Sequence, residues 1–160
     1  MKPRVLWIED SARLELRNLT GPIYYNGDFD FSQVDDTTSA VNFVTAQPFD
    51  VVIVDIRLPP GNHPAWSRFY QQAGQDKIQA QLGLKFLHWI LGAENGVGVL
   101  PPAGFSARQV GVFTVENYMD IQNELVSLGV TVFQQKSAGL PDTILEDLIK
   151  KVLAQKQNGG

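Results

Sequence analysis

The chain has 160 residues, 44% of them hydrophobic and 19% charged, and it contains no cysteine. This length supports one domain with a sizeable core, and the lack of cysteine excludes a disulfide scaffold, a thiolate zinc site and a cysteine nucleophile. A net charge of −4 with no basic run argues against a nucleic-acid surface. No segment has the length of a membrane span, and the apolar run after Met1–Arg4 is too short for a signal peptide. We therefore expect a cytoplasmic protein that binds neither nucleic acid nor membrane.

Short apolar runs rich in β-branched residues recur along the chain. They lie at 5–8, 51–54, 110–113 and 130–133. Such runs are too short for buried helices and are typical of strands that are covered on both faces, as in parallel sheets. A further strand is expected at 29–34.

Helical patterns separate these strands and predict an alternating (βα)5 order. The expected helices run from Ser11 to Leu19, from 38 or 39 to 47, and over 84–91, 119–128 and 144–153. This order predicts an α/β fold with a doubly wound, five-stranded parallel sheet. We expect a single domain over 1–154 and a flexible tail over 155–160, which has no apolar residue.

Residues suited to phosphate chemistry follow the apolar runs. These residues are Glu9 and Asp10 after the first run, Asp55 after the second, Thr114 after the third, and Lys136 beyond the last. The carboxyl ends of parallel strands share one edge of a sheet, and open α/β sheets bind ligands at that edge. We therefore expect these side chains to converge.

The charges of these residues indicate a metal and a phosphoryl group. Carboxylates within about 4 Å of one another repel by roughly 4 kcal/mol per pair at an effective dielectric near 20, so the acidic cluster calls for a cation. Oxygen ligands without a histidine or cysteine cluster favour Mg²⁺ or Mn²⁺. Lys136 and the hydroxyl of Thr114 suit the oxygens of a bound phosphoryl group. The combination predicts phosphoryl transfer to a carboxylate.

The motifs around these residues resemble those of receiver domains in the two-component response-regulator family. They are V-L-W-I-E-D at 5–10, V-V-I-V-D-I-R-L-P-P-G at 51–61, V-G-V-F-T-V at 110–115 and F-Q-Q-K at 133–136. Their order and spacing cover nearly the whole chain, and together they are specific although each alone is weak. The resemblance implies the flavodoxin-like receiver fold.

The resemblance also implies a role for each acidic residue. Asp55 would be the phospho-acceptor, which becomes a 4-aspartylphosphate. Glu9 and Asp10 would position Mg²⁺ (or Mn²⁺) together with Asp55, and the backbone carbonyl of Arg57 would be a further metal ligand.

The remaining motif residues would bind the phosphoryl group or respond to it. Thr114 and Lys136 would contact it, and Phe133 would act with Thr114 as a switch residue. The implied phosphodonor is a histidine kinase or a phosphotransfer protein. The downstream target is unknown, and a homodimer is left open.

The chain departs from the family pattern at several positions. Val115 replaces a small residue after the threonine, and Ser137 replaces a proline after the lysine. The segment 62–82 delays the third helix, and 93–108 is also long. The apolar spacing within 62–82, with Gly74 as a weak point, predicts an ordered and partly helical insertion after the third strand.

Two other functions fit parts of this pattern. A pseudo-receiver would keep the fold, remain unphosphorylated and hold a partner, and a Mg²⁺-dependent phosphatase could use the same carboxylates. An acidic residue at a strand end is also often only a helix cap or turn former. The joint presence of the acidic pair, Asp55, Thr114 and Lys136 favours an active receiver that catalyses its own phosphorylation.

Overall fold

The computed structural model describes residues 1–12, 15–92 and 97–158. Its parallel strands form a five-stranded sheet in the order β2-β1-β3-β4-β5. The strands are β1 (Arg4–Ile8), β2 (Asp30–Val34), β3 (Val51–Val54), β4 (Val110–Thr114) and β5 (Val132–Gln135). The strand order reverses between β1 and β3, where open α/β sheets bind ligands. The predicted doubly wound parallel sheet is therefore confirmed.

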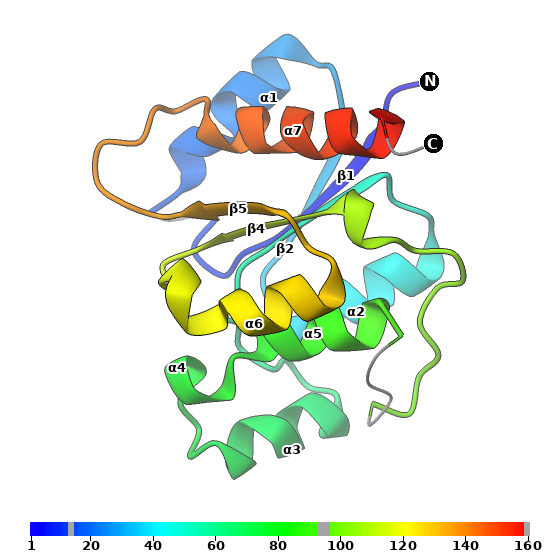
Figure 1. Cartoon of the computed structure of the whole chain (residues 1–160), viewed down its shortest axis with the longest axis vertical. Coiled ribbons are helices and arrows are strands. Elements are labelled where there is room, and N and C mark those ends of the chain that lie inside the picture. Colours follow the sequence, from blue (N-terminus) through cyan, green and yellow to red (C-terminus); the bar gives the residue numbers. More distant parts are fainter. Residues whose placement is uncertain (13–14, 93–96, 159–160) are drawn as a thin grey trace.

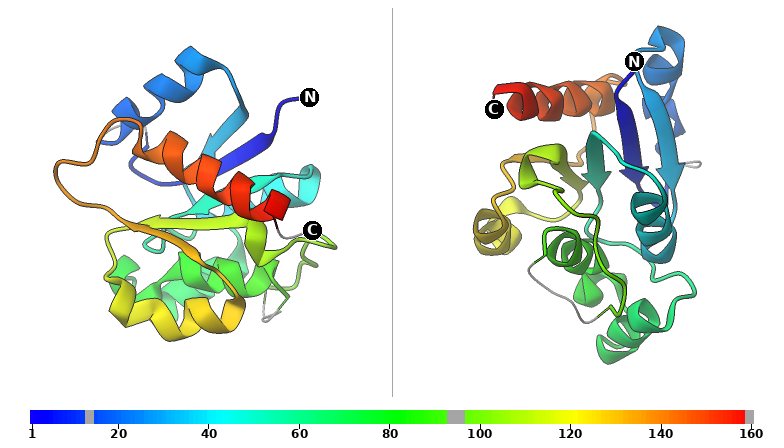
Figure 2. Two further views of the ribbon diagram at one scale, coloured as in Figure 1. Left: turned by 45° about the horizontal axis from the view of Figure 1, so that its top comes forward. Right: turned by 90° about the vertical axis from the view of Figure 1, so that its right-hand side faces the viewer.

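Helices among the described residues cover both faces of the sheet (Figure 1, Figure 2). On one face lie α1 (Gly21–Asn26) and α7 (Ile144–Asn158), and on the other lie α2 (Thr37–Ala46), α5 (Leu82–Ile90) and α6 (Tyr118–Leu128). Outside this second layer lie α3 (Pro64–Gln72) and α4 (Lys77–Ala80), and short 3₁₀ turns occupy Arg17–Leu19 and Ala107–Gln109. No helix in the described ranges is both long enough and apolar enough to cross a membrane.

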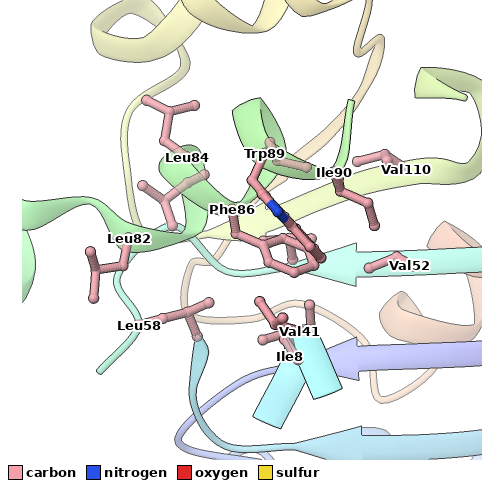
Figure 3. Packing of buried hydrophobic residues seen from close by; sticks show 14 of the residues in the cluster. Ile8, Val41, Val52, Leu58, Leu82, Leu84, Phe86, Trp89, Ile90 and Val110 are labelled. Atoms are coloured by element: carbon pink, nitrogen blue, oxygen red, sulfur yellow. The ribbon is translucent and has the colours of Figure 1, made fainter. Parts of the chain in front are cut away.

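Alternation along the strands divides the core into two clusters. In β1, Leu6 and Ile8 pack with α2, α5 and α6, whereas Val5 and Trp7 pack with α1 and α7. Figure 3 shows the first cluster, in which α5 contributes the large side chain of Trp89. Because β1, β3 and β4 are covered on both faces, their sequences are almost continuously apolar.

The segment 62–82 forms two helices, as its apolar spacing predicts. In α3 the buried Trp66 packs into the core cluster. The chain then turns through Gly74 and Gln75, whose φ angles are +74° and +56°, before α4 begins. Left-handed backbone cannot continue a right-handed helix, so the segment is divided at the predicted weak point.

Two expected helices need correction. The chain runs through a 3₁₀ turn at Arg17–Leu19, and its first helix begins at Gly21 instead of ending there; residues 13 and 14 of the expected helix lie outside the described ranges. Pro22 is tolerated in this first turn because its missing N–H would have no helical partner.

The last helix, α7, continues through Asn158. The flexible tail expected at 155–160 is therefore wrong for residues 155–158, and residues 159 and 160 lie outside the described ranges. The Gln155 side chain accepts a hydrogen bond from the Thr131 hydroxyl and donates one to the Arg108 carbonyl. Lys156 Nζ lies 2.8 Å from Asp50 Oδ1. These polar partners come from distant loops, so the lack of apolar residues did not reveal the extension.

The strand β5 begins two residues later than the expected 130–133. Gly129 closes α6 in a left-handed conformation, and the Val130 N–H donates to the Leu125 carbonyl. Val130 therefore belongs to the helix end and not to the sheet.

The start of α5 lies against the backbone after β3. The Gly83 N–H donates to the Ile56 carbonyl at 3.0 Å, and a Cβ on Gly83 would lie 1.9 Å from the Asp55 carbonyl oxygen. Only glycine permits this approach, which positions α5 directly behind Asp55.

We predict that Gly83→Ala lowers the free energy of unfolding by about 1–3 kcal/mol or more, because α5 must move away from Asp55. Urea unfolding measures the change. The matched control is Gly21→Ala, where an added Cβ meets nothing within 4 Å. Equal stability of the two variants would contradict the close approach.

Candidate functional site

The acidic residues meet at the carboxyl ends of β1 and β3. The pairing of Ile8 with Val54 places Glu9 and Asp55 at the same level of the sheet, and the Asp55 N–H donates to the Ile8 carbonyl at 3.1 Å. Glu9, Asp10 and Asp55 each offer a carboxylate oxygen, and these oxygens lie within 4.8 Å of one another. The expected convergence of these residues is confirmed.

Lys136, which directly follows the edge strand β5, also contacts this cluster. Its N–H donates to the Thr114 carbonyl at 2.7 Å, which extends the β4–β5 pairing up to the site. Its Nζ contacts Glu9 Oε1 and lies 3.1 Å from Asp55 Oδ2. One ammonium group therefore bridges two carboxylates.

Burial perturbs the pKa of Glu9. It is 1% exposed, and this burial, together with the neighbouring Asp55, raises its pKa from 4.5 to about 8 against the opposing effect of Lys136. Burial acts to lower the pKa of Lys136, but Asp55 and Glu9 outweigh it and raise the value. A cation bound beside Glu9 would favour the charged form of its carboxyl and lower this pKa.

Asp10 has a partner that the sequence analysis missed. Lys77 Nζ, on α4, lies 2.6 Å from Asp10 Oδ2, and this hydrogen bond raises the pKa of Lys77. In the sequence, Lys77 is one of several polar residues along the segment 62–82. Its contact depends on the turn between α3 and α4, and no local pattern indicated it.

A second missed residue, Glu116, connects the loops after β3 and β4. It is 5% exposed, and it accepts a hydrogen bond from Arg57 Nε at 2.8 Å. The Arg57 N–H faces Asp55 Oδ1 at 3.3 Å, and the Glu116 N–H donates to Thr114 Oγ1 at 3.3 Å. Thr114 is fully buried at the end of β4. These contacts connect Asp55 to Thr114 through Arg57 and Glu116.

Phe133 lies on β5, away from the acidic cluster. Its ring packs against the core, with its centroid 5.1 Å from that of Tyr118 at the start of α6. Phe133 therefore packs between β5 and α6. The expected roles of Phe133 and Thr114 as switch residues stay predictions.

The cluster opens into a pocket of about 490 Å³. It is lined by Glu9, Asp10, Ser11, Glu15, Leu16, Asp55, Arg57, Lys77, Ile78, Val115, Lys136 and Ser137. Two residues that depart from the family pattern, Val115 and Ser137, are in this lining, and Val115 is 44% exposed. Three oxygen donors beside an open pocket fit a hard divalent cation that keeps waters and a phosphate among its ligands.

Solved receiver domains share this architecture. No family model and no curated protein matches the chain. A CheY-like receiver domain from Methanospirillum hungatei superposes with a TM-score of 0.65 at 14% identity, with 100% of each chain covered. The receiver domain of a putative LuxO repressor from Vibrio parahaemolyticus gives 0.59 at 19% identity, covering 100% of this chain and 99% of its own. The fold is that of a response-regulator receiver domain.

A third similar structure is the Mn²⁺-bound form of the response regulator Rcp1. It gives a TM-score of 0.57 at 19% identity, covering 97% of this chain and 92% of its own. At such identities the likeness establishes the receiver fold and leaves the function to be argued from the site.

The raised pKa of Glu9 predicts how the metal-free chain responds to pH. A carboxyl whose folded pKa is about 8 and whose usual value is 4.5 stabilises the fold below pH 4.5 and loses that contribution as pH rises to 8. Glu9→Gln keeps a neutral side chain, so we expect it to remove this decline and to melt several degrees above the parent at pH 8.

Thermal melts from pH 5 to pH 8 in a chelator measure this effect. Asp28→Asn, at an exposed acid, is the control and should keep the decline of the parent. A Glu9→Gln variant whose melting temperature falls with pH as steeply as that of the parent would refute the assignment.

Proposed function

We propose that this chain is a response-regulator receiver that accepts a phosphoryl group on Asp55 in a Mg²⁺-dependent reaction and then changes its partner-binding surface. The observation that carries the proposal is the position of Asp55. Its carboxylate is grouped with those of Glu9 and Asp10 beside an open pocket, and it contacts Lys136. The receiver fold supports this reaction class over a hydrolase that releases product.

In the proposed reaction a carboxylate oxygen of Asp55 attacks phosphorus. A new O–P bond forms, and the bond from phosphorus to the donor nitrogen or oxygen breaks, with its electron pair leaving on the donor. Glu9, Asp10, Asp55 and the Arg57 carbonyl would hold Mg²⁺, which when bound neutralises charge on the phosphoryl oxygens. Asp55 is only 3% exposed, so the pocket is its access to the donor.

Lys136 has a proposed role after the transfer. The acyl phosphate carries about −1.5 to −2 charge, which attracts the ammonium group away from Glu9 and towards the phosphoryl oxygens. The Thr114 hydroxyl, now the acceptor for the Glu116 N–H, would donate to another of these oxygens. Movement of the Thr114 side chain would alter the space beside Phe133. We therefore expect β4, β5 and α6 to change conformation on phosphorylation.

The receiver fold supports a phosphodonor of the two-component class. We infer a histidine kinase or a phosphotransfer protein as donor and a protein as downstream target. The Mn²⁺-bound structure of Rcp1 supports a divalent cation in this fold. A cytoplasmic location stays a prediction, and a homodimer is left open.

We predict that incubation with acetyl phosphate and Mg²⁺ adds the mass of one phosphoryl group to the chain. A chelator should abolish the increase, because the carboxylate cluster repels the anionic donor without metal. Intact-mass spectrometry checks this, with Asp55→Asn as the unreactive control. An unmodified parent, under conditions that modify another receiver, would favour the pseudo-receiver.

We further predict that Lys136→Ala folds but loses the response to phosphorylation. The beryllium fluoride mimic should change hydrogen exchange over β5 and α6 in the parent, and this change should be absent in the variant. The control is Lys151→Ala, at an exposed lysine of α7. The same exchange response in both variants would exclude Lys136 as the link to the switch.

A further inference from the structure

We propose that Lys77 is a built-in cation that occupies the acidic pocket in the metal-free chain, and that a divalent cation binds there by displacing it and releasing α4. The inference rests on the metal-binding part of the proposed function and is independent of phosphorylation. It assigns a role to the segment 62–82, which the receiver reaction itself leaves unused.

The first step of the argument is the pairing of charges in the pocket. Lys136 contacts Glu9 and Asp55, and Lys77 contacts Asp10. Each of the three carboxylates therefore has an ammonium partner without any metal. Lys136 directly follows strand β5, whereas Lys77 is the first residue of the short helix α4.

The second step is that Lys77 and a metal compete for the same atom. Mg²⁺ binds carboxylate oxygens at about 2.0–2.1 Å. Lys77 Nζ lies 2.6 Å from Asp10 Oδ2, so a metal on that oxygen would be within about 5 Å of the ammonium group. The two cations would repel in this partly buried site, and this repulsion would weaken the contact of Lys77 with Asp10.

The third step is that Lys77 can leave without loss of the core. Its side chain is 43% exposed, whereas that of Lys136 is 13% exposed. The helix α4 has only four residues, and its backbone bonds include those from Ala80 to Asp76 and from Gln81 to Lys77. Solvent can therefore accept the ammonium group, while the buried Ala80 keeps the end of α4 on the core.

The fourth step is the backbone on either side of α4. Gln75 and Gln81 have φ angles of +56° and +45°, which are uncommon for residues other than glycine. Such conformations persist when surrounding contacts impose them, and they concentrate at segments that change conformation. The Lys77–Asp10 contact lies between them, so its loss removes one of the restraints on this geometry.

The fifth step is the effect that movement of α4 would have on a neighbouring groove. Lys77 and Ile78 line the acidic pocket, while Gln79, Ala80 and Gln81 line a separate groove of about 440 Å³ between α3, α5 and α6. Release of α4 would therefore change the shape of this groove. The anchors on either side, the buried Trp66 and the Gly83 bond to Ile56, confine the change to α4.

The test measures Mg²⁺ affinity by isothermal titration calorimetry without any phosphodonor. Lys77→Gln should bind Mg²⁺ roughly tenfold more tightly than the parent, because the competing charge is gone. Lys151→Gln makes the same change in net charge on α7 and should bind like the parent. Hydrogen exchange over 75–81 provides the second readout. Mg²⁺ should speed it in the parent, and metal-free Lys77→Gln should already exchange at the faster rate.

Unchanged or weaker Mg²⁺ affinity in Lys77→Gln overturns the proposal, as does the absence of binding in both chains. Exchange over 75–81 that Mg²⁺ leaves unaltered in the parent overturns the release of α4. Phosphorylation of Asp55 is measured separately by intact mass. Metal binding without a mass change would therefore refute the proposed function and leave this inference standing.

Discussion

The gathering of three carboxylates at one edge of a buried sheet is the constraint on which the rest of this structure depends. Their repulsion grows as water is excluded, so each needs a proton, a cation or a metal. In the metal-free chain, Glu9 meets this need by a raised pKa and by contact with Lys136. The same imbalance is what makes the site suitable for a divalent cation and a phosphoryl group.

Rigid backbone elements hold these groups in place. The register of β1 and β3 sets Glu9 against Asp55, and Gly83 allows α5 to pack directly on the Asp55 backbone. After β3, the hydroxyls of Thr37 and Thr38 donate to the carbonyls of Pro59 and Pro60, which ties the loop beside the site to α2. A carboxylate on such a support transmits a change of charge to its neighbours by small movements.

The second lysine at the site changes how the metal-free state should be regarded. Lys77 contacts Asp10, and Lys77 and Ile78 of α4 line one side of the pocket. Receiver domains with a similar fold differ from this chain in more than four-fifths of their residues. The argument for function therefore depends on the contacts of the site and on the segment that supplies Lys77.

Much of the fold and of the site could be predicted from the sequence because both depend on local patterns. Apolar runs at parallel-strand length predicted the sheet core, and the residue after each run had to lie at its carboxyl edge, which placed Glu9, Asp55 and Thr114. The division of 62–82 near Gly74 followed from glycine's poor helix propensity.

Contacts between distant segments were decided only by the tertiary structure. The extension of α7 depends on partners such as Asp50, and α1 begins at Gly21 only after the 3₁₀ turn at Arg17–Leu19. Likewise the Lys77–Asp10 pair joins residues 67 positions apart. Its geometry includes left-handed backbone at Gln75 and Gln81, on either side of α4. The sequence determined which groups the strands deliver to the site, because strand length and direction are local. The cations that reach those groups from insertions and loops depend on the path of the chain, which only packing sets.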